Sequence, residues 1–374
     1  MTALTVAAAR VRQGDLTLFA TSIRVKNLMR EGFYNVETLD PAEGGKGYQR
    51  LLNMARARKL ADYLVQGQEE NDAFLPTSIF LATDKEIYLN EKENTVTIDL
   101  AEIGPFNVVD GQHRLEGLRM ASEKDKRVLE FEVPVNIAVG LPELAQMSHF
   151  LIVNTTQKSV DKSVEQRIIS RLTEALDVED MPSLPRWIKR IVERGEVDKA
   201  VKIADFLNQT PGSPWEAKVR MANDINKSAT INQRSFVKAI VKYMLTPNNP
   251  LSTVNDPDKE KRIILNYWKA IENLLDDGED SVLYKYNGVE LFSRFSIPLF
   301  MKLQEVADYR VDTMTALLSD TFENLEGEYG GLGHPEWWEG GGQASRLNSA
   351  AVAIAVQALT KALHKGSSGE TIKI

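Results

Sequence analysis

The pattern of hydrophobic and polar positions divides the chain into two parts. Up to about residue 150, short apolar runs alternate with turn residues, which is typical of β-strands. Beyond about residue 160, apolar residues recur every three or four positions, as in amphipathic helices. We therefore expect an α+β protein with an N-terminal α/β domain, residues 1–160, followed by a mostly α-helical domain, residues 161–374.

The N-terminal part carries seven strand signals, at residues 16–20, 22–25, 77–82, 87–89, 95–98, 106–109 and 133–139. Two helices interrupt them. The first covers residues 53–65, and the second follows Asp110, with Leu115, Leu118 and Ala121 on its apolar face. The order strand, glycine turn, helix, strand places the N-terminus of a helix at the edge of a sheet.

The C-terminal part shows no internal repeat at a period of 20–50 residues. Its helical patterns are separated by clusters of proline, glycine and asparagine. They cover residues 162–176, 184–194, 215–227, 233–245, 258–276, 297–308, 311–324 and 346–364.

Composition removes several classes of protein. The net charge of −8 disfavours binding of nucleic acid through bulk charge, so any such contact needs a local basic patch. The absence of cysteine excludes disulfides, thiolate metal sites and cysteine nucleophiles. The four histidines form no metal-binding motif. With no signal-peptide pattern and no run of about 18 apolar residues, we expect a cytoplasmic protein without membrane contact.

The most informative segment is the sequence DGQHR at residues 110–114, directly after a strand. A glycine turn leading into a helix exposes backbone N–H groups, which form an anion site. Arg114 can form paired hydrogen bonds with phosphate oxygens, and His113 can donate a hydrogen bond or a proton. Asp110 can orient either side chain or help to hold a cation. The segment predicts a phosphate site but no particular reaction.

A purely structural interpretation of these residues also remains open. In it, Asp110 caps the helix, Arg114 pairs with Glu116 or another acid, and His113 is an ordinary surface histidine.

The DGQHR sequence resembles the signature of the DGQHR-domain family in the ParB/sulfiredoxin-like superfamily, which includes the DndB and DpdB proteins of bacterial DNA-modification systems. The resemblance covers about residues 15–170. Its flanking parts are YQR at 48–50 with Arg56, ADYL at 61–64, SIFL at 78–81 and FLIVNTTQ at 150–157.

The resemblance implies a ParB/sulfiredoxin-like α/β fold that binds a nucleoside triphosphate, ATP or a related nucleotide, together with Mg²⁺. Asp110, His113 and Arg114 would be the catalytic residues, and Asp110 and Asn154 would hold the metal. The residues expected to hold the nucleotide are Arg50, Gly111, Gln112, Arg114, Asn154 and Gln157.

Three features limit this assignment. ParB-like proteins carry a Glu-Asn pair where this chain has Val153-Asn154, which puts the metal geometry in doubt. Sulfinic acid reduction, the reaction of sulfiredoxin, is excluded because the chain has no cysteine. Arg50 is equally well explained as a solvated arginine, and because Arg56 and Arg58 point to different helix faces, we expect at most one of them to reach the ligand.

Two further segments suggest a macromolecular partner. Residues 186–238 contain eleven Lys or Arg and six Asp or Glu, so this segment could lie along a phosphate backbone or simply be a set of solvated helix faces. The pair Trp337-Trp338 lies in a glycine-rich loop, where it could form a lid or a base-stacking platform, or anchor the loop to the helical domain.

Three functional hypotheses follow. The first is a nucleotide-binding, ATP-hydrolysing protein of a bacterial DNA-modification or restriction system. The second is a DNA-binding transcriptional regulator of such a system. The third is a ParB-like metal-dependent nuclease, but the sequence contains no paired acidic motif that would support it. Candidate partners are a nucleoside triphosphate, DNA, other DNA-modification proteins and further copies of the chain.

Overall fold

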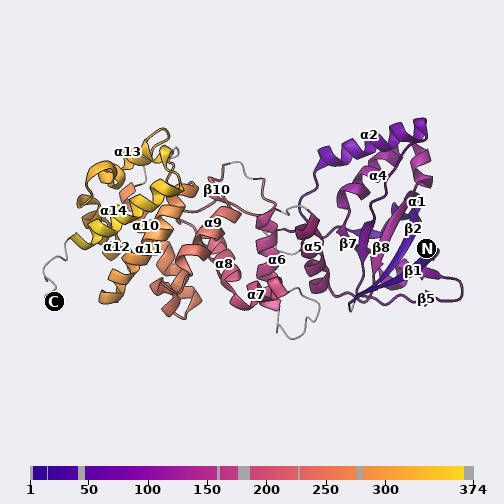
Figure 1. The fold of residues 1–374 in the computed structure, drawn as a ribbon, viewed down its shortest axis with the longest axis horizontal. Coiled ribbons are helices and arrows are strands. Elements are labelled where there is room, and N and C mark those ends of the chain that lie inside the picture. Colours follow the sequence, from indigo (N-terminus) through magenta and orange to yellow (C-terminus); the bar gives the residue numbers. More distant parts are fainter. Residues whose placement is uncertain are drawn as a thin grey trace. The chain divides into compact units, whose positions relative to one another are not determined.

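The computed structural model describes residues 3–14, 16–40, 47–157, 161–175, 186–225, 228–275 and 281–365, with the backbone alone at 155–157. The chain forms two compact units, residues 1–190 and 191–374 (Figure 1). The predicted boundary, after residue 160, differs from this division by residues 161–190. The predicted class, an N-terminal sheet domain followed by a helical region in an α+β protein, is confirmed.

Unit 1 is built on a mixed eight-stranded sheet in the order β3-β7-β4-β8-β2-β1-β6-β5. Strand β3 is parallel to β7 and β4 is parallel to β8, whereas the other neighbours are antiparallel. The strands are β1 (Leu4–Gln13), β2 (Leu16–Arg24), β3 (Tyr34–Asn35), β4 (Ile79–Ala82), β5 (Leu89–Asn90), β6 (Thr95–Ile98), β7 (Phe106–Asp110) and β8 (Glu132–Ala138).

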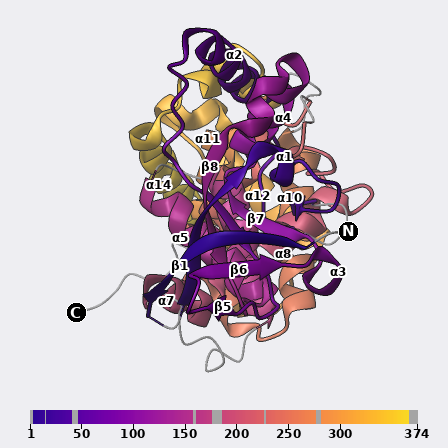
Figure 2. The same cartoon turned by 90° about the vertical axis from the view of Figure 1, so that its right-hand side faces the viewer.

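The helices of this unit are α1 (Val25–Leu28), α2 (Met54–Glu70), α3 (Leu100–Ile103), α4 (Gln112–Lys124), α5 (Glu143–Gln157) and α6 (Lys162–Ala175), with a 3-10 turn at Lys126–Glu130. Helices α2 and α4 lie together at the upper end of the unit in both views, whereas β5 lies at the lower end (Figures 1 and 2). Their apolar faces join the strands in one core, in which Leu64 and Leu118 are fully buried.

A glycine allows α2 and α4 to pack closely. A Cβ atom on Gly117 would lie 2.8 Å from Cδ2 of Leu60 and 3.1 Å from the carbonyl oxygen of Ala57. The two helices therefore pack closely at this point.

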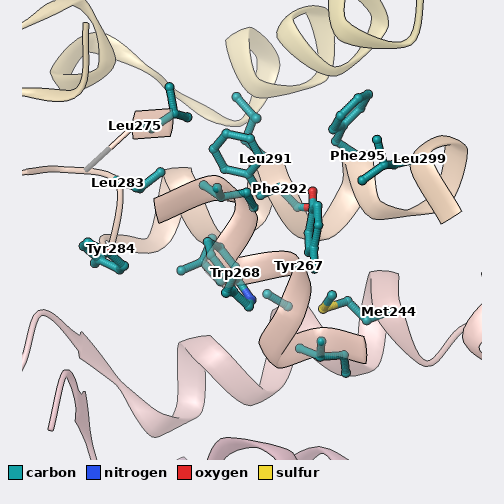
Figure 3. Close-up of a cluster of buried hydrophobic side chains, with 14 of the residues drawn as sticks. Met244, Tyr267, Trp268, Leu275, Leu283, Tyr284, Leu291, Phe292, Phe295 and Leu299 are labelled. Atoms are coloured by element: carbon teal, nitrogen blue, oxygen red, sulfur yellow. The ribbon is translucent and has the colours of Figure 1, made fainter. Parts of the chain in front are cut away.

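Unit 2 is helical apart from a two-stranded parallel ribbon. With α7, which contains the division between the units, its elements are α7 (Arg186–Arg194), α8 (Glu196–Gln209), β9 (Val219–Arg220), β10 (Ile231–Asn232), α9 (Gln233–Ala239), a π-helical turn (Ile240–Met244), α10 (Pro257–Leu275), α11 (Tyr286–Val306), α12 (Val311–Glu323), α13 (Pro335–Trp338) and α14 (Ser349–Lys365), with 3-10 turns at Pro250–Thr253, Gly327–Gly333 and Gln343–Arg346. Figure 3 shows part of its core, where Trp268 and Tyr267 of α10 lie against Phe292 of α11.

The tryptophan pair belongs to this core. Trp338 is fully buried and its Nε1 donates to the carbonyl oxygen of Leu332 at 2.9 Å. Trp337 is 7% exposed and donates to Oε1 of Gln343 at 2.9 Å. The anchoring interpretation of these tryptophans is therefore confirmed, and their rings are not available as a lid or a stacking platform.

One predicted helix is wrong, another begins too late, and several elements were not predicted. Residues 215–225 form turns and β9 instead of a helix, because Ala217 (φ 55°) and Asn223 (φ 61°) adopt left-handed backbone conformations that end helical hydrogen bonding. Helix α8 was not predicted, and α11 starts eleven residues before the predicted position and continues through Pro298. Strand β1 was also missed.

Candidate functional site

The DGQHR segment forms a sharp turn between β7 and α4. Gly111 caps α4 with φ +109°, a conformation that other residues rarely adopt. A Cβ atom there would lie 3.2 Å and 3.3 Å from two side-chain carbons of Ile79, and 3.4 Å from Nε of Arg114. The turn therefore needs glycine both for its backbone conformation and for the space around it.

A β-bulge leads into this turn. Phe80 of β4 pairs with Asp110, whereas the next residue of β4, Leu81, pairs with Val108, so Val109 is an extra residue on β7. The buried side chain of Gln49 satisfies the bulge: its Nε2 donates to the carbonyl oxygens of Val108 at 2.7 Å and Val109 at 3.0 Å. Gln49 thereby fixes the end of the strand that presents Asp110.

Arg114 and Asp110 form an ion pair across the turn. Nη2 of Arg114 lies 2.6 Å from Oδ2 of Asp110 and donates to the carbonyl oxygen of Ser78 at 3.0 Å. Its Nε is buried and has no hydrogen-bond partner in the part of the chain that the structure describes. The structural interpretation named Glu116 as one partner of Arg114, but Glu116 pairs with Arg119 at 2.7 Å.

His113 connects the starts of two helices. The backbone N–H of Asn53, the N-cap of α2, donates to Nε2 of His113 at 2.9 Å, while Oδ1 of Asn53 accepts from the backbone N–H of Arg56 at 3.1 Å. An accepting Nε2 leaves the proton of the neutral ring on Nδ1. The structure therefore makes His113 a hydrogen-bond donor through Nδ1.

Burial and neighbouring arginines keep this ring neutral. Burial, followed by the charges of Arg50 and Arg56, lowers the pKa of His113 from its ordinary value of 6.5 to about 4, whereas Asp110 acts in the opposite direction. At neutral pH, His113 is thus uncharged and only a weak base.

Arg50 adds a second guanidinium near the turn. Its carbonyl oxygen accepts a hydrogen bond from Nε2 of the buried Gln112 at 3.1 Å. Burial, followed by the charge of Arg56, lowers the pKa of Arg50, while Asp110 raises it. Among the described residues no hydrogen bond or ion pair engages the Arg50 guanidinium. Arg56 is exposed, and its charge lowers the pKa of both His113 and Arg50. Whether Arg56 or Arg58 reaches a ligand stays a prediction.

The two predicted residues of α5 are not joined to the turn by any described contact. Nδ2 of Asn154 donates to the carbonyl oxygen of Phe150 in its own helix at 2.8 Å. The side chain of Gln157 lies outside the described residues. Their roles in nucleotide or metal binding stay predictions.

The side chains at the turn could hold Mg²⁺ only if phosphate oxygens supplied further ligands. Within the described ranges no three His, Asp or Glu side chains are grouped closely enough to hold a metal ion. Asp110 offers one carboxylate, and Mg²⁺ in nucleotide sites is commonly bound by one or two carboxylates, phosphate oxygens and water. The residues present therefore fit a nucleotide-bound Mg²⁺ and do not form a separate metal centre.

Sequence reasoning missed the residues that support the site. Gln49, Asn53 and Ser78 act on it through backbone atoms or backbone partners, which no pattern of side-chain types reveals. Asn136, whose Nδ2 donates to Oγ of Ser78 at 2.9 Å, is placed by sheet register alone. The signal that could have found Gln49 is its place beside Arg50 in the YQR segment.

The basic segment 186–238 contains both ion-paired and unpaired positive charges among the residues that the structure describes. Lysines of α8 are paired, Lys199 with Glu260 at 2.9 Å and Lys202 with Asp198 at 2.9 Å. On α7, Arg186, Arg190 and Arg194 are exposed, and no described residue forms an ion pair with them. Trp187, on the same helix, is 41% exposed.

No helix in the described part of the chain combines the length and the apolar character that crossing a membrane requires.

Residues 6–167 match the model of the DndB family, which is described as DNA-sulfur modification-associated. No curated protein and no solved structure matches the chain. The predicted similarity to DndB-like proteins is thereby confirmed for the N-terminal part, which contains the whole turn, whereas the wider ParB/sulfiredoxin relationship stays a prediction. The match ends before α7, so the helical unit is not covered by it.

Proposed function

We propose that this chain binds a nucleoside triphosphate, ATP or a related nucleotide, at the Gly111 turn and hydrolyses it in the service of a DNA-sulfur modification system. The association with such a system rests on the family match of residues 6–167. The nucleotide site rests on one observation: the hydrogen bond from Asn53 to His113 joins the start of α2 to the start of α4.

Positive potential concentrates where these helices begin. A helix N-terminus carries roughly half a positive charge and presents free N–H groups, and two of them meet here. The charges of Arg50, Arg56 and Arg114 all lower the pKa of His113, so each of these cations raises the positive potential at its ring. A triphosphate is the small-molecule group whose charge best matches this arrangement.

Each residue then has a defined part in phosphoryl transfer, a reaction that depends chiefly on positioning and on stabilisation of negative charge. Arg50 and Arg114 neutralise charge on the phosphates, and the buried, unpartnered Nε of Arg114 is a donor still available to a ligand. His113 donates a hydrogen bond through Nδ1. Asp110, released from Arg114 when phosphate competes for the guanidinium, orients the attacking water.

Mg²⁺, when bound with the nucleotide, supplies neutralisation of charge on the phosphate oxygens. Asp110 is the residue of the turn that would hold it, with Asn154 as the predicted second donor.

The proposal is tested by nucleotide binding and turnover in matched arginine variants. Arg114→Lys keeps the charge but loses the forked geometry, whereas Arg119→Lys on the same helix changes a surface ion pair. We expect ATP, CTP or GTP with Mg²⁺ to raise the melting temperature of the wild type, and Arg114→Lys to weaken binding at least tenfold, about 1.4 kcal/mol. Phosphate release should fall in Asp110→Asn. Equal affinities in the two arginine variants, or no thermal shift with any triphosphate, would contradict the proposal.

A second function is favoured by α7. Its three exposed arginines, at spacings of four residues, share roughly one helix face beside the exposed Trp187. We propose, as the alternative, that this face contacts a DNA backbone and that the protein regulates transcription of its own system. A gel shift with a specific and a random duplex tests it: Arg190→Glu should weaken binding to both and reduce its dependence on salt, with Lys259→Glu as the control.

A further inference from the structure

A cavity of about 900 Å³ lies in unit 1 away from the Gly111 turn. It is bounded by strands β1 and β2, by residues 86–89, which lead into β5, by residues 139–142 after β8, by the first half of α5 and by Ala175 at the end of α6. None of residues 110–114, nor Arg50 or Asn53, lines it. The volume lies in the range of small-molecule sites, about 300–1,000 Å³.

The inner wall of this cavity is apolar. Phe19, Ile87, Val139 and Leu141 line it and are at most 8% exposed. Tyr88 also lines the cavity but, unlike these buried residues, is 81% exposed to solvent. An exposed aromatic ring beside an apolar wall can cover the flat face of a bound molecule.

Two arginines of β1 supply positive charge at the edge. Arg10 and Arg12 are two residues apart on one strand, so they project from the same face. Arg10 is neutralised by Glu91, with Nη2 and Oε1 2.7 Å apart. Arg12, which pairs across the hairpin with Thr17, forms no ion pair with any residue that the structure describes. One uncompensated guanidinium therefore faces the cavity.

Glu86 and His149 also line the cavity, and neither side chain has a hydrogen-bond partner among the described residues. The carboxylate of Glu86 lies against Gly140, whose absent Cβ would be 2.2 Å from Oε1, so glycine is what makes room for it. Burial lowers the pKa of His149, so its ring is neutral. Glu86 accepts hydrogen bonds, and neutral His149 can donate or accept one.

We propose that this hairpin pocket binds an amphipathic organic anion of mononucleotide size. Its anionic group lies on Arg12 and its planar body lies between Tyr88 and the apolar wall. Its hydrogen-bond donors, such as sugar hydroxyls or ring N–H groups, are accepted by Glu86. The pocket is a second ligand site, and the proposal does not depend on nucleotide hydrolysis at the Gly111 turn.

Isothermal titration with AMP, GMP, CMP and UMP tests this proposal on the full chain. We expect saturable binding of at least one of them with a Kd below about 1 mM. Arg12→Glu reverses the only charge proposed to hold the phosphate, and Ala145→Trp fills the cavity from α5; each should weaken binding at least tenfold. Arg12 is exposed on its strand, so the first variant tests the pocket even where the second fails to fold.

Two controls separate this site from others. Arg30→Glu removes an exposed arginine elsewhere in the same unit and should not change the affinity for the monophosphate. In an Arg114→Ala background, where phosphate binding at the Gly111 turn is weakened, the monophosphate binding that depends on Arg12 should remain. Binding that is lost in Arg114→Ala and retained in Arg12→Glu and Ala145→Trp would overturn the proposal, as would the absence of saturable binding by all four monophosphates.

Discussion

The backbone N–H of Asn53 donates a hydrogen bond to Nε2 of His113 across 2.9 Å, and this contact joins the first turns of α2 and α4. The same helices touch farther along at Gly117, where a side chain would collide with Leu60. Two points of contact fix the relative position of two helix N-termini, which is what a preformed anion site requires. His113 therefore has a structural task in addition to any contact with a ligand.

Replacement of His113 by alanine should destabilise the fold. The Asn53 N–H loses its acceptor at an exposed position, where water can replace it, and the lost hydrogen bond costs about 1 kcal/mol. The free energy of unfolding, measured with urea, is expected to fall by that amount. His364→Ala, at an exposed position near the end of α14, serves as the control and should change stability by less than about 0.5 kcal/mol. If both variants unfold alike, the hydrogen bond does not stabilise the protein.

The lowered pKa of His113 makes stability depend on pH in a defined window. The unfolded chain binds a proton at this histidine below about pH 6.5, whereas the folded chain does so only near pH 4. Because protonation favours the unfolded state, the free energy of unfolding should decrease as the pH falls from about 6.5 to about 4 and then level off.

Comparison with His113→Asn isolates this effect, since His149, whose pKa burial also lowers, contributes equally to both proteins. The wild type should lose more stability between pH 7 and pH 5 than the variant. In NMR titration, the His113 ring should change charge near pH 4, and a bound triphosphate should raise that midpoint. A midpoint near pH 6.5 in the free protein would show that the folded structure does not lower the pKa of His113.

Local patterns predicted the part of the fold that matters most for this site. The run Val108-Val109-Asp110-Gly111 contains a strand and the glycine that ends it, and the structure has β7, the turn and α4 in that order. The helix predicted at 215–227 was wrong over the described residues 215–225, where Trp215 lies in a turn and packs against Phe236 and Trp268. Tertiary packing, rather than the local hydrophobic pattern, determines the conformation of that segment.

Strand β1 escaped prediction for a different reason. Its sequence contains three consecutive alanines, a residue depleted in strands, and of its side chains only Ala8 is buried. Its place in the sheet comes from pairing with β2 and β6, which are distant from each other in sequence. The supporting contacts of Gln49 and Asn53 have the same origin, because they depend on segments brought together by the sheet.

Substitution of Gly111 by alanine should disturb both the fold and the turn. The backbone conformation at φ +109° is strained for any L-residue, and the added Cβ would press on Ile79 and approach Nε of Arg114. We expect a loss of about 1–3 kcal/mol in unfolding free energy and weaker triphosphate binding. Gly32→Ala is the matched control, since Gly32 also has positive φ (+71°) but has nothing within 4 Å of the new Cβ. Its loss should be smaller, about 1 kcal/mol, with binding unchanged.

Replacement of Gln49 by leucine should be more damaging than its distance from the motif in sequence suggests. The buried amide satisfies the carbonyl oxygens of Val108 and Val109, and leucine leaves both without this donor. A loss of about 1–3 kcal/mol follows from the desolvation of buried polar groups. These carbonyls belong to the bulge that sets the direction of Asp110. The variant should therefore also bind a triphosphate more weakly than the wild type under conditions in which both proteins are folded. Gln66→Leu, on the exposed face of α2, provides the comparison and should leave both stability and binding within error of the wild type. Equal stability of the two variants would show that the bulge does not need the amide of Gln49.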